Sequence, residues 1–130
     1  MQPLALSVLP ESLAVCRLEA AAKVPAWAHT GTFRVVTRTP AELSIVCRED
    51  AIPAGVPANR GWRAIAVDGT LDFALTGILA SLASPLAAAG VSIFAVSTYD
   101  TDYVLVKQET LERALEALAA AGHRVARHAP

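Results

Sequence analysis

The stretch VSIFAVSTYDTDYVLV, residues 91–106, decides the fold of the second half of the chain. Residues 91–97 are a β-type run, Tyr99-Asp100-Thr101 is a tight polar turn, and the chain returns as a second apolar run over residues 102–106. β-branched and aromatic residues favour strands, and a short polar segment between two such runs favours a turn. The stretch therefore predicts a β-hairpin.

Strand and helix patterns flank this hairpin on both sides. Gly90 and Gly122 each follow a run of apolar residues at helical spacing, where a left-handed residue ends a helix. Pro85 lies inside the first of these helices and should kink it or open one hydrogen bond. The predicted elements are a strand at residues 62–67, a helix at 78–90, the hairpin, a helix at 110–122 and a strand at 123–127. Their order, β-α-β-β-α-β, is that of the ferredoxin-like α+β fold.

The first half of the chain repeats this pattern imperfectly. Moving residues 33–46 forward by 60 positions places them on residues 93–106, and both stretches read strand, short polar turn, strand. Val36 then meets Val96, and Ile45 meets Leu105. Any two hairpins share part of such a pattern, but the matching pairs favour an internal duplication.

The first copy lacks the helices of the second. Residues 13–18 read as a strand, only residues 25–29 could make a helical turn, and residues 51–59 read as a connector with two prolines and a glycine. We therefore expect a tandem arrangement, with a degenerate N-terminal half at residues 1–58 and a complete C-terminal domain at residues 61–128.

Composition excludes several classes of protein. The chain has 130 residues, is 54% hydrophobic, and carries 11 basic against 12 acidic residues, a net charge of -1. So apolar a chain is not disordered, and it lacks the basic excess of a nucleic-acid-binding protein. The uncharged stretch between Asp72 and Asp100 is interrupted by Pro85 and Gly90, so we expect a helix and a strand there rather than a membrane span. Without a signal-peptide pattern at the N-terminus, we expect a cytoplasmic protein.

Cysteines and histidines are scattered along the chain. Cys16 and Cys47 each lie in an alternating apolar run, which favours buried reduced thiols over a disulfide or a metal pair. His29, His123 and His128 do not cluster, and His123 is most simply a cation placed at a helix C-terminus. We therefore expect neither a metal site nor a catalytic set.

Two segments have the residue types of a ligand site. Residues 69–77 lead from a strand into a helix N-terminus, where free backbone amides and the helix dipole suit a small carboxylate. The turn at residues 97–102 offers hydroxyls and an acidic side chain, which suit an ammonium group. Together they fit a zwitterionic amino acid. The alternatives are a plain N-cap by Asp72 or Thr76 and a turn whose acids are merely solvated.

The segments at residues 77–82 and 92–106 resemble the ACT domain family, in the subgroup shared by aspartate-kinase regulatory regions and the CASTOR arginine sensors. Residues 37–47, TRTPAELSIVC, resemble small stand-alone bacterial members of that subgroup. The resemblance extends from about Leu4 to Val125. It implies regulatory amino-acid sensing without catalysis, with the ligand at the interface between two modules.

The resemblance also implies which residues touch the ligand. In the loop and helix start these are Asp72, Leu75, Thr76, Gly77 and Ile78, and at the facing strand end they are Thr98, Tyr99 and Asp102. Arginine sensors of this subgroup have an acidic residue near the position of Leu75, so a smaller or more apolar amino acid is as good a candidate as arginine. The degenerate first half implies one site per chain, or one shared across a dimer.

Three hypotheses follow for function. The first is a stand-alone tandem ACT-like ligand sensor that binds a small amino acid or related metabolite, forms a homodimer and acts on a target enzyme, with no cofactor. The second is a dimerisation or protein-interaction module without a ligand. The third is an enzyme on a ferredoxin-like scaffold, for which Asp100 and Asp102 are the only acidic pair on offer.

Overall fold

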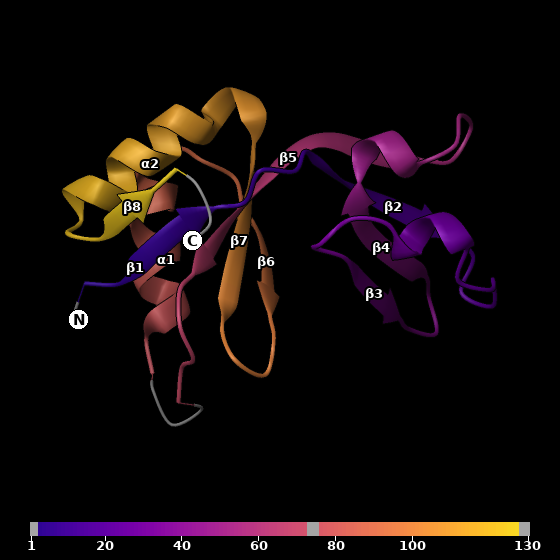
Figure 1. Cartoon of the computed structure of the whole chain (residues 1–130), viewed down its shortest axis with the longest axis horizontal. Coiled ribbons are helices and arrows are strands. Elements are labelled where there is room, and N and C mark those ends of the chain that lie inside the picture. Colours follow the sequence, from indigo (N-terminus) through magenta and orange to yellow (C-terminus); the bar gives the residue numbers. More distant parts are fainter. Residues whose placement is uncertain (1–2, 73–75, 128–130) are drawn as a thin grey trace. The chain divides into compact units, whose positions relative to one another are not determined.

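The computed structural model describes residues 3–72 and 76–127, which form two compact units. The N-terminal unit is Glu11–Trp62, and the C-terminal unit combines Met1–Pro10 with Arg63–Pro130 (Figure 1). In chain order the elements are β1 (Ala5–Val8), β2 (Leu13–Leu18), η1 (Ala26–His29), β3 (Val35–Arg38), β4 (Leu43–Arg48), η2 (Glu49–Ala51), β5 (Ala58–Val67), α1 (Ile78–Ala88), β6 (Phe94–Ser97), β7 (Asp102–Lys107), η3 (Gln108–Thr110), α2 (Leu111–Ala120) and β8 (Arg124–Ala126), where η marks a short 3₁₀ helix.

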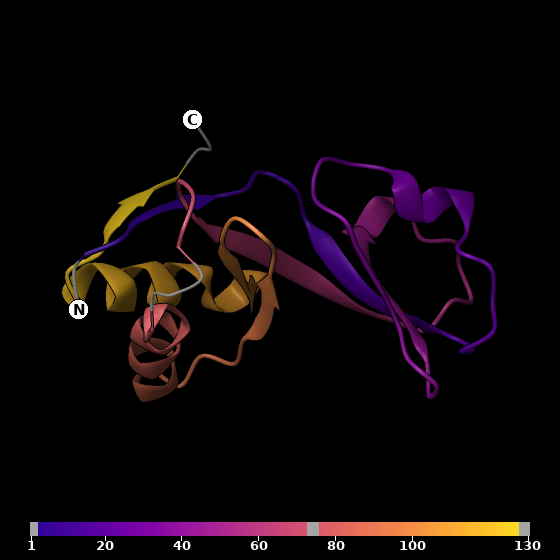
Figure 2. The ribbon, with the colours of Figure 1, turned by 90° about the horizontal axis from the view of Figure 1, so that it is seen from below.

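The C-terminal unit has the predicted β-α-β-β-α-β order, from β5 through α1, β6, β7 and α2 to β8. Its strands lie in the order β6-β7-β5-β1-β8, and both helices cover one face of them (Figure 2). The core between the helices and the strands is aliphatic: Leu6, Val8, Ile65, Val67, Leu82, Leu86, Val91, Val104, Val106, Leu111, Ala114, Leu115 and Leu118. The α+β, ferredoxin-like prediction is thus confirmed for this half.

One strand of the C-terminal unit was missing from the prediction. β1 lies between β5, to which it is antiparallel, and β8, to which it is parallel. The described residues of the segment before Glu11 therefore belong with the second half of the chain, and the boundaries of the compact units fall after Pro10 and after Trp62. The sequence analysis had instead assigned residues 1–58 to the N-terminal half and 61–128 to the C-terminal domain.

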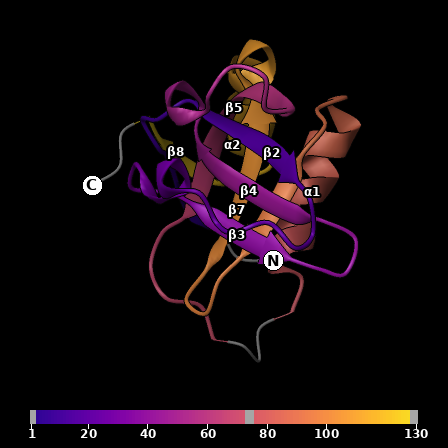
Figure 3. The same ribbon diagram turned by 90° about the vertical axis from the view of Figure 1, so that its right-hand side faces the viewer.

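The N-terminal unit is built on the antiparallel strand order β3-β4-β2-β5 (Figure 3). Its helical segments are only the 3₁₀ turns η1 and η2. The strand face that they cover carries a smaller core of Ala14, Cys16, Ala28, Leu43, Ile45, Cys47 and Ile52. The unit is therefore a degenerate copy of the C-terminal fold, as predicted.

The two copies correspond at an offset of 59 residues, one fewer than the sequence comparison gave. Thr39 and Thr98 open the two hairpin turns, and each donates its backbone amide to the carbonyl three residues later, at 2.9 Å and 2.8 Å respectively. The offset of 59 places Ile45 on Val104, and both are core residues. The offset of 60 had placed Ile45 on Leu105, which points to the opposite face of β7. A one-residue slip keeps the residue types similar but reverses the side-chain faces.

The same offset explains where the helix of the first copy was lost. The turn η2 corresponds to η3, and Ile52 corresponds to Leu111, which begins α2. Both side chains are buried, with 7% and 6% of their surface exposed. After Ile52, however, the chain runs Pro53-Ala54-Gly55-Val56-Pro57, and the φ of Gly55 is +91°. Two prolines and a left-handed glycine prevent the helix from continuing.

Cys16 and Cys47 are free cysteines, and both are buried, as the alternating apolar runs predicted. Both thiols lie in the core of the N-terminal unit, on the neighbouring strands β2 and β4. Burial, with the neighbouring Cys47 as a second cause, raises the pKa of the Cys16 thiol to about 11. Because the thiolate is the reactive form, neither cysteine has the character of a nucleophile near neutral pH.

No helix within the described residues is long and apolar enough to cross a membrane. The uncharged stretch before Asp100 forms α1 and leads into β6, as expected.

His123 has a different role from the predicted one. Its ring is buried, Nδ1 accepts a hydrogen bond from the Leu4 amide at 3.1 Å, and Nε2 lies 3.1 Å from the Ser81 carbonyl oxygen. Since Nδ1 accepts, the ring is neutral with its proton on Nε2, which donates to Ser81. Ser81 lies four residues before Pro85, which has no amide to donate. His123 therefore satisfies the carbonyl that Pro85 leaves open in α1, and the expectation of a cation at the helix end was wrong.

This arrangement predicts coupling between Pro85 and His123. His123→Ala should lower the free energy of unfolding by about 2–3 kcal/mol, because it leaves the Leu4 amide and the Ser81 carbonyl unpaired. In a Pro85→Ala background, where residue 85 can donate to Ser81, the same change should cost about 1 kcal/mol less. Urea denaturation of the four proteins measures both effects. Strictly additive costs would show that His123 does not compensate for the proline.

Candidate functional site

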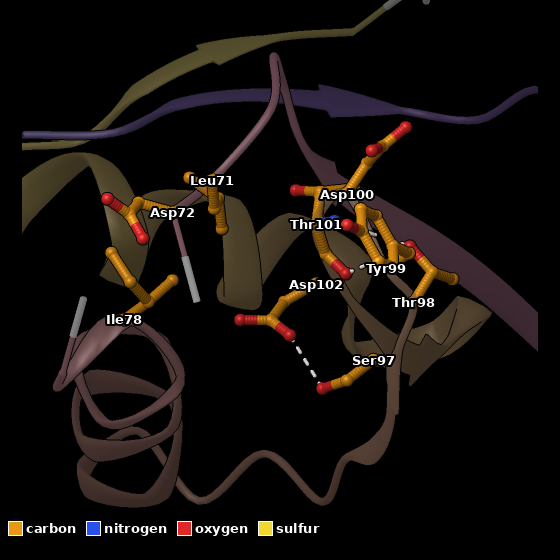
Figure 4. A pocket seen from close by; sticks show the side chains of 9 residues that line it. All are labelled: Leu71, Asp72, Ile78, Ser97, Thr98, Tyr99, Asp100, Thr101 and Asp102. Carbon is orange, nitrogen blue, oxygen red and sulfur yellow. Dashed lines mark hydrogen bonds between the residues drawn. The ribbon is translucent and has the colours of Figure 1, made fainter. Parts of the chain in front are cut away.

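A pocket of about 200 Å³ opens in the C-terminal unit, at the end of the β6–β7 hairpin. Figure 4 shows Asp72 and Ile78 on one side of it and the hairpin turn on the other. Three segments contribute: the loop after β5, the start of α1, and the turn itself. The lining residues are Leu71, Asp72, Ile78, Ser97, Thr98, Tyr99, Asp100, Thr101 and Asp102.

Hydrogen bonds fix the hairpin turn against the end of β5. Within the turn, the Thr98 hydroxyl donates to the Thr101 carbonyl at 3.1 Å. The Thr101 side chain is buried, and its hydroxyl donates to the Val67 carbonyl at 2.6 Å. The backbone amide of Leu71 donates to the Asp100 carbonyl at 2.6 Å. The two walls of the pocket are therefore joined at its base.

The pocket is acidic. Asp72, Asp100 and Asp102 line it, and no lysine or arginine is among the lining residues. Asp102 accepts a hydrogen bond from the Ser97 hydroxyl at 2.6 Å, which leaves further lone pairs on its carboxylate. In Figure 4 the Asp102 carboxylate points into the space between the turn and α1, whereas the Asp100 carboxylate points away from it. Asp102 is therefore the turn carboxylate best placed to meet a cationic group.

The facing wall is the start of α1. The first intrahelical hydrogen bond runs from the Ser81 amide to the Gly77 carbonyl at 2.9 Å, so the amides of the first turn have no partner inside the helix. No acidic residue lies in that first turn. The positive end of the helix therefore faces an acidic turn, and Ile78 adds an apolar contact between them.

The structure brings five of the eight predicted site residues together around this pocket. They are Asp72, Ile78, Thr98, Tyr99 and Asp102. Thr76 and Gly77 are exposed and do not line it, and Leu75 lies outside the described residues. Gly77 has a φ of +78°, a conformation that side chains strain, so its backbone alone accounts for the glycine.

Four further lining residues lie in the two predicted segments but were not among the eight predicted contacts. Ser97, Asp100 and Thr101 belong to the same polar turn as the predicted residues, so its composition was a usable signal for all of them. Leu71 gave no such signal, because its place depends on the hydrogen bond between its amide and the turn.

The described parts of the chain hold no group of three or more His, Cys, Asp or Glu side chains arranged to bind a metal ion. The pocket presents carboxylates, hydroxyls and a small apolar wall.

The bond between Thr101 and Val67 predicts a measurable cost for its loss. Thr101→Val removes the hydroxyl at constant shape and leaves a buried carbonyl unpaired, so it should lower the free energy of unfolding by about 1–2 kcal/mol. Thr101→Ser, which keeps the hydroxyl, should cost less. Tyr99→Ala is the control, because this side chain is 80% exposed and should change stability by less than about 0.5 kcal/mol. A Thr101→Val protein as stable as the wild type in urea denaturation would refute this role.

Comparison with known proteins agrees with this description. An ACT domain family model matches residues 58–120, and a model of a separate N-terminal domain matches residues 11–55. The human protein named cytosolic arginine sensor for mTORC1 subunit 1 is 38% identical over 58 residues. That match covers 44% of this chain but only 18% of the human protein, so the two are alike over a small part of the longer one.

Solved structures extend the likeness over the whole chain. Protein Atu0741 from Agobacterium tumefaciens is 41% identical, with a TM-score of 0.94, and the match covers 100% of this chain and 97% of that one. The regulatory subunit of aspartate kinase from Thermus thermophilus shares the fold, with a TM-score of 0.60, 13% identity and coverage of 86% and 93%. With a full-length relative at this identity and the ACT model on its second half, the chain belongs to the ACT domain family.

Proposed function

We propose that the chain is a non-catalytic regulatory protein that binds a small amino acid, or a related metabolite, in the pocket of its C-terminal unit. The observation that carries this proposal is the placement of Asp102 opposite the amides at the start of α1. An amino acid carries an ammonium and a carboxylate on one carbon. Such a ligand needs an anion and an amide-lined positive site close together, and this pocket offers both.

Each part of the ligand has a partner in this arrangement. The ammonium meets the Asp102 carboxylate and the hydroxyl of Thr98, while the carboxylate meets the first-turn amides of α1. Leu71 and Ile78 leave room for a short or apolar side chain. A volume of about 200 Å³ is below that of typical drug-sized sites, which fits a small metabolite.

The names of the relatives support the ligand class. One relative is named an arginine sensor, and a protein with the same fold is a regulatory subunit of aspartate kinase. The family resemblance places an acidic residue near the position of Leu75 in arginine sensors, and this chain has leucine there. We therefore keep a smaller or more apolar amino acid beside arginine as the candidate ligand.

The proposal extends to assembly and location, as the resemblance implies. A second ACT module, contributed by another copy of the chain in a homodimer, would cover the open side of the pocket, and a target enzyme would respond to the ligand. We expect this protein in the cytoplasm. Sedimentation with and without the ligand tests the dimer.

Thermal unfolding against the twenty amino acids, purines and pyrimidines tests the ligand. A ligand at about a hundred times its dissociation constant stabilises the native state by about 2.7 kcal/mol, which raises Tm by several degrees. Asp102→Asn should keep the fold and abolish most of this shift, because the ammonium loses its charged partner. Asp100→Asn is the matched control: its side chain points away from the pocket, so the shift should persist.

Two results would contradict the proposal. An equal loss of the shift in both variants would mean that only the net charge of the turn matters. A panel without any hit, repeated at several protein concentrations, would favour the ligand-free interaction module. For that alternative the chain offers α1, which carries no charged residue and exposes Leu79 at 36%.

A further inference from the structure

The N-terminal unit has a hairpin turn that corresponds to the turn lining the pocket. At the position of the pocket-lining Ser97, this unit has an arginine, Arg38. Arg38 precedes the first turn as Ser97 precedes the second, and each is paired across its hairpin, Arg38 with Leu43 and Ser97 with Asp102. The two residues are 59 positions apart, the offset at which the cores of the two units correspond. Arg38 therefore occupies the position of a pocket-lining residue.

The Arg38 side chain reaches the segment that corresponds to the other wall of the pocket. Its guanidinium donates from Nη1 to the Ala20 carbonyl and from Nη2 to the Ala22 carbonyl, the latter at 2.8 Å. Ala20 and Ala22 lie between β2 and η1, the first strand and first helical turn of this unit. The corresponding loop of the C-terminal unit joins β5 to α1 and contributes Leu71 and Asp72 to the pocket.

In the C-terminal unit, Ser97 leaves the space between the turn and the facing loop open. Ser97 is short and its hydroxyl turns back to Asp102 at 2.6 Å, so no side chain from this position crosses to the facing loop. A guanidinium spans from turn to loop in one unit, and a pocket lies between turn and loop in the other.

The charges of the two turns change together with this residue. Asp100 and Asp102 correspond to Ala41 and Leu43, so the N-terminal turn has a cation of its own and lacks these two carboxylates, while its single acidic residue, Glu42, corresponds to Thr101. The C-terminal turn has the carboxylates, and its pocket lining has no cation. The N-terminal turn thus has its own guanidinium as the cation. The C-terminal turn has carboxylates that suit a cationic group supplied by a ligand.

We propose that the N-terminal unit contains a guanidinium-binding site, formed by the carbonyl oxygens of Ala20 and Ala22, which the Arg38 side chain of the same chain occupies permanently. No external cation can consequently reach these two carbonyls while Arg38 is present. The comparison with a ligand site rests on the proposed function of the C-terminal pocket, whereas the guanidinium site itself rests on the contacts of Arg38.

Chemical rescue tests this site. Arg38→Ala removes the guanidinium and should lower Tm by a few degrees. Methylguanidinium at millimolar concentration should restore most of that loss, because its planar fork can donate to both carbonyls, whereas methylammonium and urea should not. The wild type and Arg113→Ala, which removes an exposed arginine of α2, are the controls, and methylguanidinium should leave their Tm unchanged or slightly lower.

Several outcomes would overturn the proposal. These are an Arg38→Ala protein that is destabilised but not rescued, one that is as stable as the wild type and shows no response, or an equal rise of Tm in Arg113→Ala. If Arg38→Ala fails to fold, Arg38→Gln offers the same comparison with a shorter polar side chain. Because methylguanidinium rescue does not depend on any amino-acid hit, this test can fail or succeed independently of the proposed sensor function.

Discussion

The hydrogen bond from the Thr98 amide to the Thr101 carbonyl is the constraint on which the C-terminal unit depends. By closing a four-residue turn, it sets the pairing of β6 with β7 and thereby directs Val104 and Val106 to the core under the helices. The same turn presents its acidic residues at the open end of the hairpin and ties the Thr101 hydroxyl to β5. Core packing and pocket geometry thus follow from one local structure.

The N-terminal unit has the same turn, opened by Thr39, and the same direction of core residues, yet it has lost its helices and has Arg38 where the C-terminal unit has the pocket-lining Ser97. A small core under two 3₁₀ turns buries little apolar area, so additional polar ties have more to contribute there. Arg38 is one such tie, since it joins the turn of the unit to its first loop. In our account, duplication produced two equivalent sites, one of which the chain fills by itself.

Local patterns made much of this fold predictable. The hairpin, both α-helices and the missing helices of the first copy follow from periodicity, prolines and glycines that act over a few residues. The offset of the duplication could not be predicted in this way. A shift of one residue still aligns similar residue types in two apolar strands, but it places every side chain on the opposite face of the sheet. β1 has only four residues, and its partners β5 and β8 are remote in sequence. His123 was misjudged for the same reason, since its partners Leu4 and Ser81 come from distant segments. The polar turn of the site was predictable, whereas the contribution of Leu71 depended on a tertiary hydrogen bond.

The central claim concerns the two corresponding turn sites: the one in the C-terminal unit is vacant, and Arg38 fills the one in the N-terminal unit. Amide chemical-shift mapping of the wild-type chain, titrated with the amino acid that stabilises it, tests this most directly. The account predicts that the amides of residues 76–81 and 97–102 shift and that the titration saturates at one ligand per chain. Shifts of comparable size at residues 19–25 and 38–43, or saturation at two ligands per chain, would contradict it.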